Sequence, residues 1–257
     1  MNRQLLINCD DLGMHQTIDD AIFDILKQGF IRSCSIMPTG NNFHSAIEQF
    51  KALGGKRLGV HLALTGEYHR LPTVPVCRAS EVPSLVDENG HLHREIAETM
   101  QKADLDEVRL ELSRQIEVVA EQGLELTHLD GHCFFYEANE GGPELYQIAH
   151  KLAAEHRLPL RCNLSPRDGL TKGTEMLWDQ HNDEEPRFAY YDKLLATMNV
   201  FPRELIIHPA KDLGAMGSFS ASGARRVADY RYFMAERWLD ILRSRDITIV
   251  SWADFAV

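Results

Sequence analysis

Short apolar runs alternate with amphipathic stretches along the whole chain, and this alternation constrains the fold more than any other feature. The runs that predict strands are residues 4–9, 33–37, 58–64, 126–130, 160–164, 204–208 and 247–251. The stretches between them that predict helices are residues 17–27, 43–52, 105–121, 143–156, 191–198 and 228–243. Alternation of this kind is typical of a parallel sheet whose crossovers are helices.

The number of predicted strands indicates the architecture. Seven parallel strands with connecting helices favour an α/β fold, an irregular (β/α) barrel with one strand fewer than the usual eight and incomplete closure. The 257 residues suffice for one such domain, and no linker or internal repeat divides them. We therefore expect a single domain over residues 1–257, with its active site at the C-terminal ends of the strands. Two long segments, 65–102 and 165–192, exceed a simple crossover and predict lids or binding loops beside that site.

Composition restricts the partners of the chain. Hydrophobic residues make up 44% and charged residues 25%, which are ordinary values for a globular protein. The net charge of -11 disfavours nucleic acid and fits a neutral or cationic small substrate. Five separated cysteines without a CxxC pair indicate reduced thiols, hence a cytoplasmic protein. No signal peptide or apolar run of membrane-spanning length is predicted, and the oligomeric state is left open, with a homodimer as one option.

Four of the predicted strands end in residues that suit metal binding or acid–base chemistry. Asp10 and Asp11 follow the first strand, and adjacent carboxylates repel each other unless a cation shares their charge. His61, His132 and His208 stand at three further strand ends. Each histidine alone is better explained as a hydrogen-bonded core residue. Together with the aspartates, they favour a divalent metal site of Asp11, His61 and His132, with Asp10 free as a base.

Several neighbours have two interpretations each. His128 and Asp130 share a strand face with His132, so Asp130 is either a partner of a ligating imidazole or a loop cap, and His128 is either a second partner or a core residue. Arg161 either orients a catalytic aspartate through a bidentate pair or forms a structural ion pair. Cys9 is expected to point away from Asp10, because side chains alternate along a strand.

At these residues the sequence resembles the YdjC-type carbohydrate deacetylases, the family of chitooligosaccharide deacetylase, over nearly its whole length. Residues 5–13 (LLINCDDLG) resemble the family's opening ADDFG, and residues 59–65 (GVHLALT) its GxHLxLT. Residues 83–90 resemble its sLvDenG turn, residues 127–132 (THLDGH) its THxDSH, and His208-Pro209 its late HP. The family implies a barrel related to that of the polysaccharide deacetylases.

The resemblance also implies roles. Asp11, His61 and His132 match the metal ligands, Asp10 the catalytic base and His208 the acid. One departure is that the family's second and third histidines after DS are replaced here by Phe134 and Tyr136, which makes the neighbouring wall more aromatic and suits a sugar face.

The expected function is therefore hydrolysis of N-acetyl groups from an amino sugar or short oligosaccharide, assisted by one divalent metal ion, Mg or Zn. Two alternatives stay open at this point: hydrolysis of another amide or ester at the same site, and a non-catalytic sugar-binding barrel. A spare carboxylate beside the metal ligand argues against pure binding, because binding alone needs no base.

Overall fold

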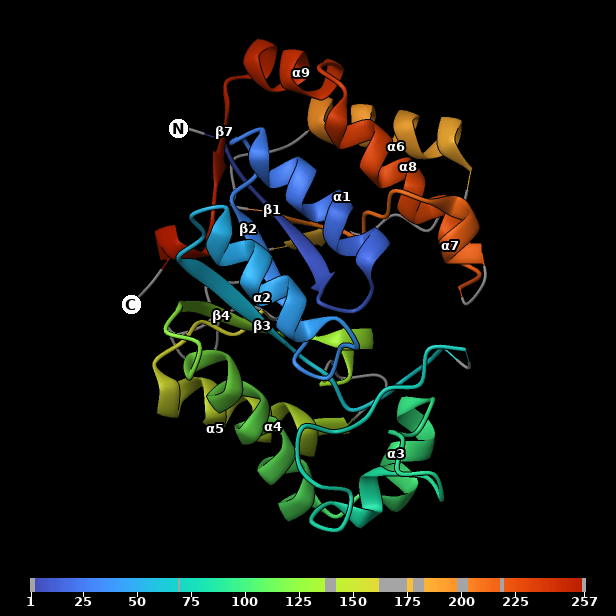
Figure 1. The fold of residues 1–257 in the computed structure, drawn as a ribbon. Coiled ribbons are helices and arrows are strands. Elements are labelled where there is room, and N and C mark those ends of the chain that lie inside the picture. Colours follow the sequence, from blue (N-terminus) through green and yellow to red (C-terminus); the bar gives the residue numbers. More distant parts are fainter. Residues whose placement is uncertain are drawn as a thin grey trace.

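The computed structural model describes residues 3–68, 70–136, 142–161, 175–177, 183–197, 203–217 and 220–255 (Figure 1). The strands are β1 (Arg3–Leu12), β2 (Ser33–Ile36), β3 (Arg57–Leu62), β4 (Glu125–Gly131), β5 (Glu175–Leu177), β6 (Arg203–Ile207) and β7 (Ile247–Val250). The α-helices are α1 (Gln16–Lys27), α2 (Phe43–Ala52), α3 (Ile96–Lys102), α4 (Leu105–Ala120), α5 (Gly142–His156), α6 (Glu184–Thr197), α7 (Leu213–Gly217), α8 (Gly223–Met234) and α9 (Arg237–Arg245). Short 3₁₀ turns occur at Pro83–Leu85, His132–Phe134 and Trp252–Phe255.

All strand pairs are parallel, and the sheet has the order β4-β3-β2-β1-β6-β5 with β7 beside β1. Helices surround the strands: α1 and α2 cover one face, α4 and α5 lie below, and α6, α8 and α9 lie above in the view of Figure 1. Among the described residues no pairing joins β4 to β5, so the described strands do not close the barrel there. The expected irregular α/β barrel with seven parallel strands is confirmed.

β1 is the centre of the sheet because three strands pair with it. One of its edges carries β6 along residues 5–9. The other edge carries β7 along residues 3–6 and then β2 from Asn8 onward. One long strand thus bridges a break between two short ones. Its burial is complete along Leu5–Leu12, which explains the apolar start of this run, and the buried polar residues Asn8, Asp10 and Asp11 require partners.

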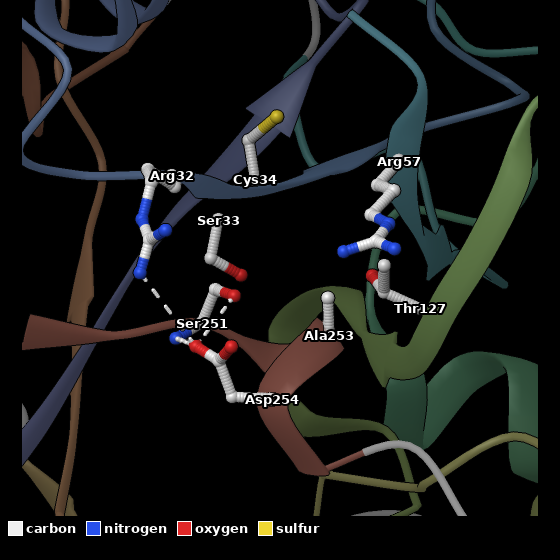
Figure 2. A pocket seen from close by; sticks show the side chains of 8 residues that line it. All are labelled: Arg32, Ser33, Cys34, Arg57, Thr127, Ser251, Ala253 and Asp254. Atoms are coloured by element: carbon white, nitrogen blue, oxygen red, sulfur yellow. Dashed lines mark hydrogen bonds and ion pairs between the residues drawn. The ribbon is translucent and has the colours of Figure 1, made fainter.

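A small cavity of about 150 Å³ opens where β7 ends and β2 begins (Figure 2). Its lining residues are Arg32, Ser33, Cys34, Arg57, Thr127, Ser251, Ala253 and Asp254. Arg32 precedes β2, Ser33 begins it and Arg57 begins β3, so this side of the cavity lies at the N-terminal ends of strands, away from the candidate site. We interpret it as a consequence of the change of partner along β1.

The secondary structure differs from the prediction in a few places. Of the run 160–164, only Leu160 pairs, in a single bridge to Leu129, and residues 162–164 lie outside the described part of the chain. The short strand β5 was not predicted. The predicted helix 228–243 is two helices, α8 and α9, because the backbone of Ala235 is extended (ψ 152°).

The short helices α3 and α7 were not predicted, whereas α1, α2, α4 and α5 begin and end close to the predicted residues. α4 begins at the cap Asp104, whose carboxylate accepts the backbone N–H groups of Asp106 and Glu107. α6 begins earlier than predicted, at Glu184, and includes Pro186 in its first turn, where a proline costs no helical hydrogen bond. Within the described residues, no helix combines the length and apolarity that a membrane crossing requires.

Gly59 in β3 shows how tightly the interior near the site is packed. A Cβ atom on Gly59 would lie 2.1 Å from Cε1 of His128. The His128 ring cannot easily move, since it stacks on Trp252 at 4.7 Å and an interplanar angle of 14°. A glycine is therefore required at this close approach.

We expect Gly59→Ala to lower the free energy of unfolding by about 1–3 kcal/mol, the usual cost of overpacking a core. Urea denaturation would measure it. Gly217→Ala is the matched control, since nothing lies within 4 Å of its added Cβ. Equal stability of the Gly59 and Gly217 variants would show that the His128 ring moves to make room for the added methyl group.

Candidate active site

The turn after β1 directs two neighbouring carboxylates to different partners. Asp11 has a φ of 69°, a left-handed conformation that is uncommon for residues other than glycine. The turn is held by Asp19, whose carboxylate accepts the N–H of Gly13 at 2.6 Å and also binds the side chain of Asn42. Asp10 is 2% exposed and Asp11 is fully buried. The strained backbone at Asp11 therefore points the two neighbouring carboxylates in different directions.

Asp11, His61 and His132 form a triangle of ligand-type atoms. Oδ1 of Asp11 lies 3.1 Å from Nε2 of His61 and 3.2 Å from Nδ1 of His132. The two imidazole nitrogens are 3.2 Å apart. Ligand atoms about 2.1 Å from one ion are about 3.0 Å apart at right angles and about 3.4 Å apart at the tetrahedral angle. The three atoms thus have the spacing that a single divalent ion requires, and their donor set suits one.

Each imidazole has a carboxylate on its outer nitrogen. Nδ1 of His61 lies 2.9 Å from Oδ1 of Asp130, and Nε2 of His132 lies 2.8 Å from Oε2 of Glu67. A carboxylate at that position accepts the ring N–H and leaves the lone pair of the other nitrogen toward the triangle. His61 and His132 therefore present opposite ring nitrogens to the same point.

A buried guanidinium binds three carboxylates behind the triangle. Arg161 donates to both oxygens of Asp10, at 2.7 and 2.9 Å. It also lies 2.9 Å from Oδ2 of Asp130 and 2.9 Å from Oε1 of Glu204. Asn8 donates to Asp10 at 2.7 Å. Asp10 is thereby fixed without entering the triangle.

Arg226 is the second cation of the site. Its Nη2 donates to Oδ2 of Asp11 at 2.7 Å and to the hydroxyl of Tyr68 at 3.2 Å. Burial by itself would raise the pKa of Asp11, but Arg226, His132 and His61 hold it well below its usual range. Four buried carboxylates (Asp10, Asp11, Asp130 and Glu204) thus face two buried guanidinium groups, which leaves two formal negative charges. A divalent cation would balance them.

The protonation of His61 reflects the same excess of negative charge. Burial alone would lower the pKa of His61, but Asp130 and Asp10 beside it raise the pKa to about 10. A buried cluster that draws a proton onto an imidazole also favours a metal ion at the same place, since both supply positive charge.

His208 lies on the other side of Asp10. Its Nε2 is 4.0 Å from Oδ2 of Asp10, and its backbone N–H donates to Asp229 at 3.0 Å. Asp229 is itself bound by Arg187 and by the hydroxyl of Tyr191, both at 2.5 Å. Burial lowers the pKa of His208 to about 4, so its imidazole is neutral at pH 7.

Comparisons with known proteins identify the family of this chain. The family model described as YdjC-like protein matches residues 4–244 of the chain. The chain belongs to the YdjC-like family.

Curated relatives of this YdjC-like protein carry a common name. A carbohydrate deacetylase of Enterococcus faecalis is 31% identical over 201 residues, covering 77% of this chain and 73% of the relative. A carbohydrate deacetylase of Thermoanaerobacter pseudethanolicus is 22% identical and covers 98% of both chains. One from Listeria monocytogenes serotype 4a is 24% identical over 98% of this chain and 99% of its own.

Solved structures show the same fold. A protein of Enterococcus faecalis V583, provisionally described as a cellobiose-phosphate cleavage protein, matches with a TM-score of 0.84 at 24% identity, covering all of both chains. A mutant of BA3943, a CE4 family pseudoenzyme, matches with a TM-score of 0.51 at 8% identity and covers 68% of that chain. These likenesses confirm the expected relation to the polysaccharide deacetylase fold.

In this YdjC-like protein one of the two aromatic replacements, Tyr136, is not part of an exposed wall. Tyr136 is 1% exposed, and its hydroxyl donates to the backbone oxygen of Arg161 at 2.7 Å. Its ring therefore supports the Arg161 backbone and offers no surface to a sugar. The side chain of Phe134 lies outside the described part of the structure. Cys9 is buried in the apolar core, and Cys133 is exposed.

His128 and Asp130 are partners in one network. Nε2 of His128 lies 3.3 Å from Oδ2 of Asp130, and Ser35 donates to the same oxygen at 2.7 Å. Asp130 also contacts His61 and Arg161, so it links a ligand-type imidazole to the buried guanidinium. Of its two interpretations, a partner of an imidazole and a loop cap, the contacts match the first.

Sequence reasoning missed four residues that complete the site: Asn8, Glu67, Glu204 and Arg226. Glu67 stands two residues beyond the motif 59–65, at the mouth of the barrel, and that position was a usable signal. Glu204 lies in a strand with a buried apolar run, and a buried acid at such a position requires a partner. Arg226 is a helix residue more than 200 positions from Asp11, and no local pattern predicts their contact.

We expect Arg161→Met to lower the free energy of unfolding by about 3–5 kcal/mol, because it leaves buried carboxylates without their counter-ion. Urea denaturation of the metal-free protein measures this. Arg114→Met is the matched control: its pairs with Glu117 and Glu121 are exposed and should contribute less than about 1 kcal/mol. Similar losses in both variants would contradict a special role for the Arg161 cluster.

Proposed function

We propose that this protein is a metal-dependent hydrolase that removes the N-acetyl group from an amino sugar or a short oligosaccharide. The observation that carries the proposal is the triangle of Asp11, His61 and His132 beside a separately held carboxylate, Asp10. The name carbohydrate deacetylase among curated relatives supports the choice of bond and substrate class.

Asp11, His61 and His132 would hold the metal ion. One carboxylate and two imidazoles suit Zn²⁺ and several other divalent ions, and Mg²⁺ is the second candidate. Three protein ligands leave positions open for substrate and water. When bound, the ion supplies polarisation of the acetyl carbonyl and a lowered pKa for a water molecule. The residues around it supply the remaining steps.

Asp10 is the proposed base. Arg161 and Asn8 hold its carboxylate in one orientation, so it accepts the proton of the attacking water without first reorganising. His208 is the proposed acid, which delivers a proton to the leaving amine. Because burial keeps its imidazole neutral, it must receive that proton during the reaction. Asp10, with Oδ2 at 4.0 Å from Nε2, is the proposed source of that proton.

One proton of the attacking water reaches the leaving amine in three transfers. The water proton passes to Asp10, then to His208 and then to the amine nitrogen, while the water oxygen forms the new bond to the acetyl carbon. Cleavage of the C–N bond releases the free amino sugar and acetic acid, which retains the second proton of the water and loses it to solvent as acetate, and both side chains return to their starting protonation. Asp229, through the backbone N–H of His208, keeps the imidazole at this end of β6.

The function is tested by metal analysis together with acetate release from N-acetylglucosamine oligomers. We expect one divalent ion per chain, loss of activity on chelation and recovery on adding Zn²⁺ or Mg²⁺. His61→Ala should lose both the ion and the activity, whereas His156→Ala, an exposed residue at the end of α5, should keep both. Hydrolysis of simple esters without acetate release from sugars would favour another hydrolase, and sugar binding without hydrolysis would favour a binding barrel.

The acid role of His208 is tested with two substrates. An amine leaves poorly unless it is protonated, whereas an activated phenol leaves readily. We therefore expect His208→Ala to lose roughly 10²–10⁴-fold in kcat on an N-acetyl sugar but far less on an activated acetate ester. Asp10→Asn is the control, since both reactions need an activated water, and it should lose activity on both. Equal losses on the two substrates in His208→Ala would rule out the acid role.

A further inference from the structure

The segment that follows β3 supports the metal-ligand triangle from outside at two consecutive residues. Glu67 lies 2.8 Å from Nε2 of His132. The hydroxyl of Tyr68 accepts from Nη2 of Arg226, which also donates to Asp11. One short segment thus supports two of the three ligand residues, His132 directly and Asp11 through Arg226.

The two imidazoles differ in how their outer carboxylates are held. Asp130, behind His61, is fully buried and contacts Ser35, His128 and Arg161 within the barrel. Glu67, behind His132, lies on a loop and its side chain is 26% exposed. The orientation of His61 is therefore set by the barrel itself, whereas that of His132 depends on a residue outside the sheet.

An imidazole needs such a partner, because its two flipped orientations have nearly the same shape. With Glu67 accepting the Nε2–H, the lone pair of Nδ1 faces Asp11 and His61. A ring turned by 180° would place a carbon there instead, and the triangle would lose one donor. The negative charge of Glu67 also makes the inner nitrogen a stronger ligand.

The position of Glu67 is determined by the long segment 65–102. The N–H of Gly66 donates to the backbone oxygen of His93 at 2.9 Å. A Cβ atom on Gly66 would lie 2.8 Å from Cβ of Thr73, so the backbone passes very close to that side chain. The excursion at the barrel mouth therefore holds the residue before Glu67 on two sides.

We propose that Glu67 is a positioning residue that fixes His132 with Nδ1 toward the metal ion and thereby sets the affinity of the site for metal. This inference rests on the proposed metal site, and it assigns to the segment 65–102 a part in assembling that site.

Metal affinity, measured by competition for Zn²⁺ with a chromophoric chelator, tests the proposal on the purified full-length chain. Glu67→Ala should bind Zn²⁺ about 10–100-fold more weakly, the usual effect of removing a partner of a ligating histidine. Glu67→Gln should fall between the wild type and Glu67→Ala, because an amide oxygen still accepts the Nε2–H but carries no charge. Glu81→Ala is the matched control, a glutamate of the same segment that pairs with Arg78 at the surface.

A second measurement reports the orientation of the His132 ring. In ¹⁵N spectra of the zinc-loaded, histidine-labelled wild type, one imidazole should bind the metal through Nδ1 and another through Nε2. Glu67→Ala should weaken or broaden the Nδ1-bound signal and leave the other unchanged.

Affinity within twofold of wild type in Glu67→Ala, or an equal loss in Glu81→Ala, would overturn the inference. Failure of the wild type to bind any divalent ion would overturn it together with the metal site. Tight metal binding that depends on Glu67 without acetate release from any sugar would uphold the inference and reject only the proposed substrate.

Discussion

The ion cluster around Arg161 is the interaction on which the rest of the site depends. Its guanidinium contacts Asp10, Asp130 and Glu204, which come from three different strands, and all four side chains are at most 3% exposed. Removing charges from water costs several kcal/mol for each, and the mutual attraction offsets that cost only when geometry and hydrogen bonds are nearly complete. Asn8, Ser35 and Trp252 provide those additional hydrogen bonds. The cluster therefore joins β1, β4 and β6 through a contact that tolerates little displacement.

The cluster also explains why the triangle is suited to a cation. Arg161 and Arg226 do not neutralise all the buried carboxylates, and the remaining charge is concentrated beside His61. The positive φ of Asp11 turns its carboxylate away from Arg161 and toward the two imidazoles. A backbone strain of about 1–3 kcal/mol is the typical cost of such a conformation. It separates two adjacent aspartates, one held by a guanidinium and the other available as a ligand.

The site residues are held partly by the sheet and partly by the loops at the mouth of the barrel. His61 and Asp130 are register partners in β3 and β4, and the backbone N–H of Arg161 donates to Leu129 of β4, so the sheet fixes all three positions. His132 and Asp11 receive further support from Glu67 and Tyr68, which belong to the excursion after β3. Figure 1 shows that excursion beyond the C-terminal ends of the strands, around α3. A rigid sheet combined with adjustable loops allows the same fold to serve different substrates.

The sequence by itself determined the strand–helix order, the parallel sheet and the strand ends that carry Asp10, Asp11, His61, His132 and His208, because period and burial leave a local pattern in the residues. It also indicated the two interpretations of Arg161. Only the tertiary structure decided that Arg161 pairs with Asp10, that Arg226 reaches Asp11 and that Glu67 supports His132. It likewise divided the last predicted helix at Ala235 and buried Tyr136. These contacts join residues 65 to 215 positions apart, and a pairing over such distances depends on how the whole chain packs, which no local spacing records.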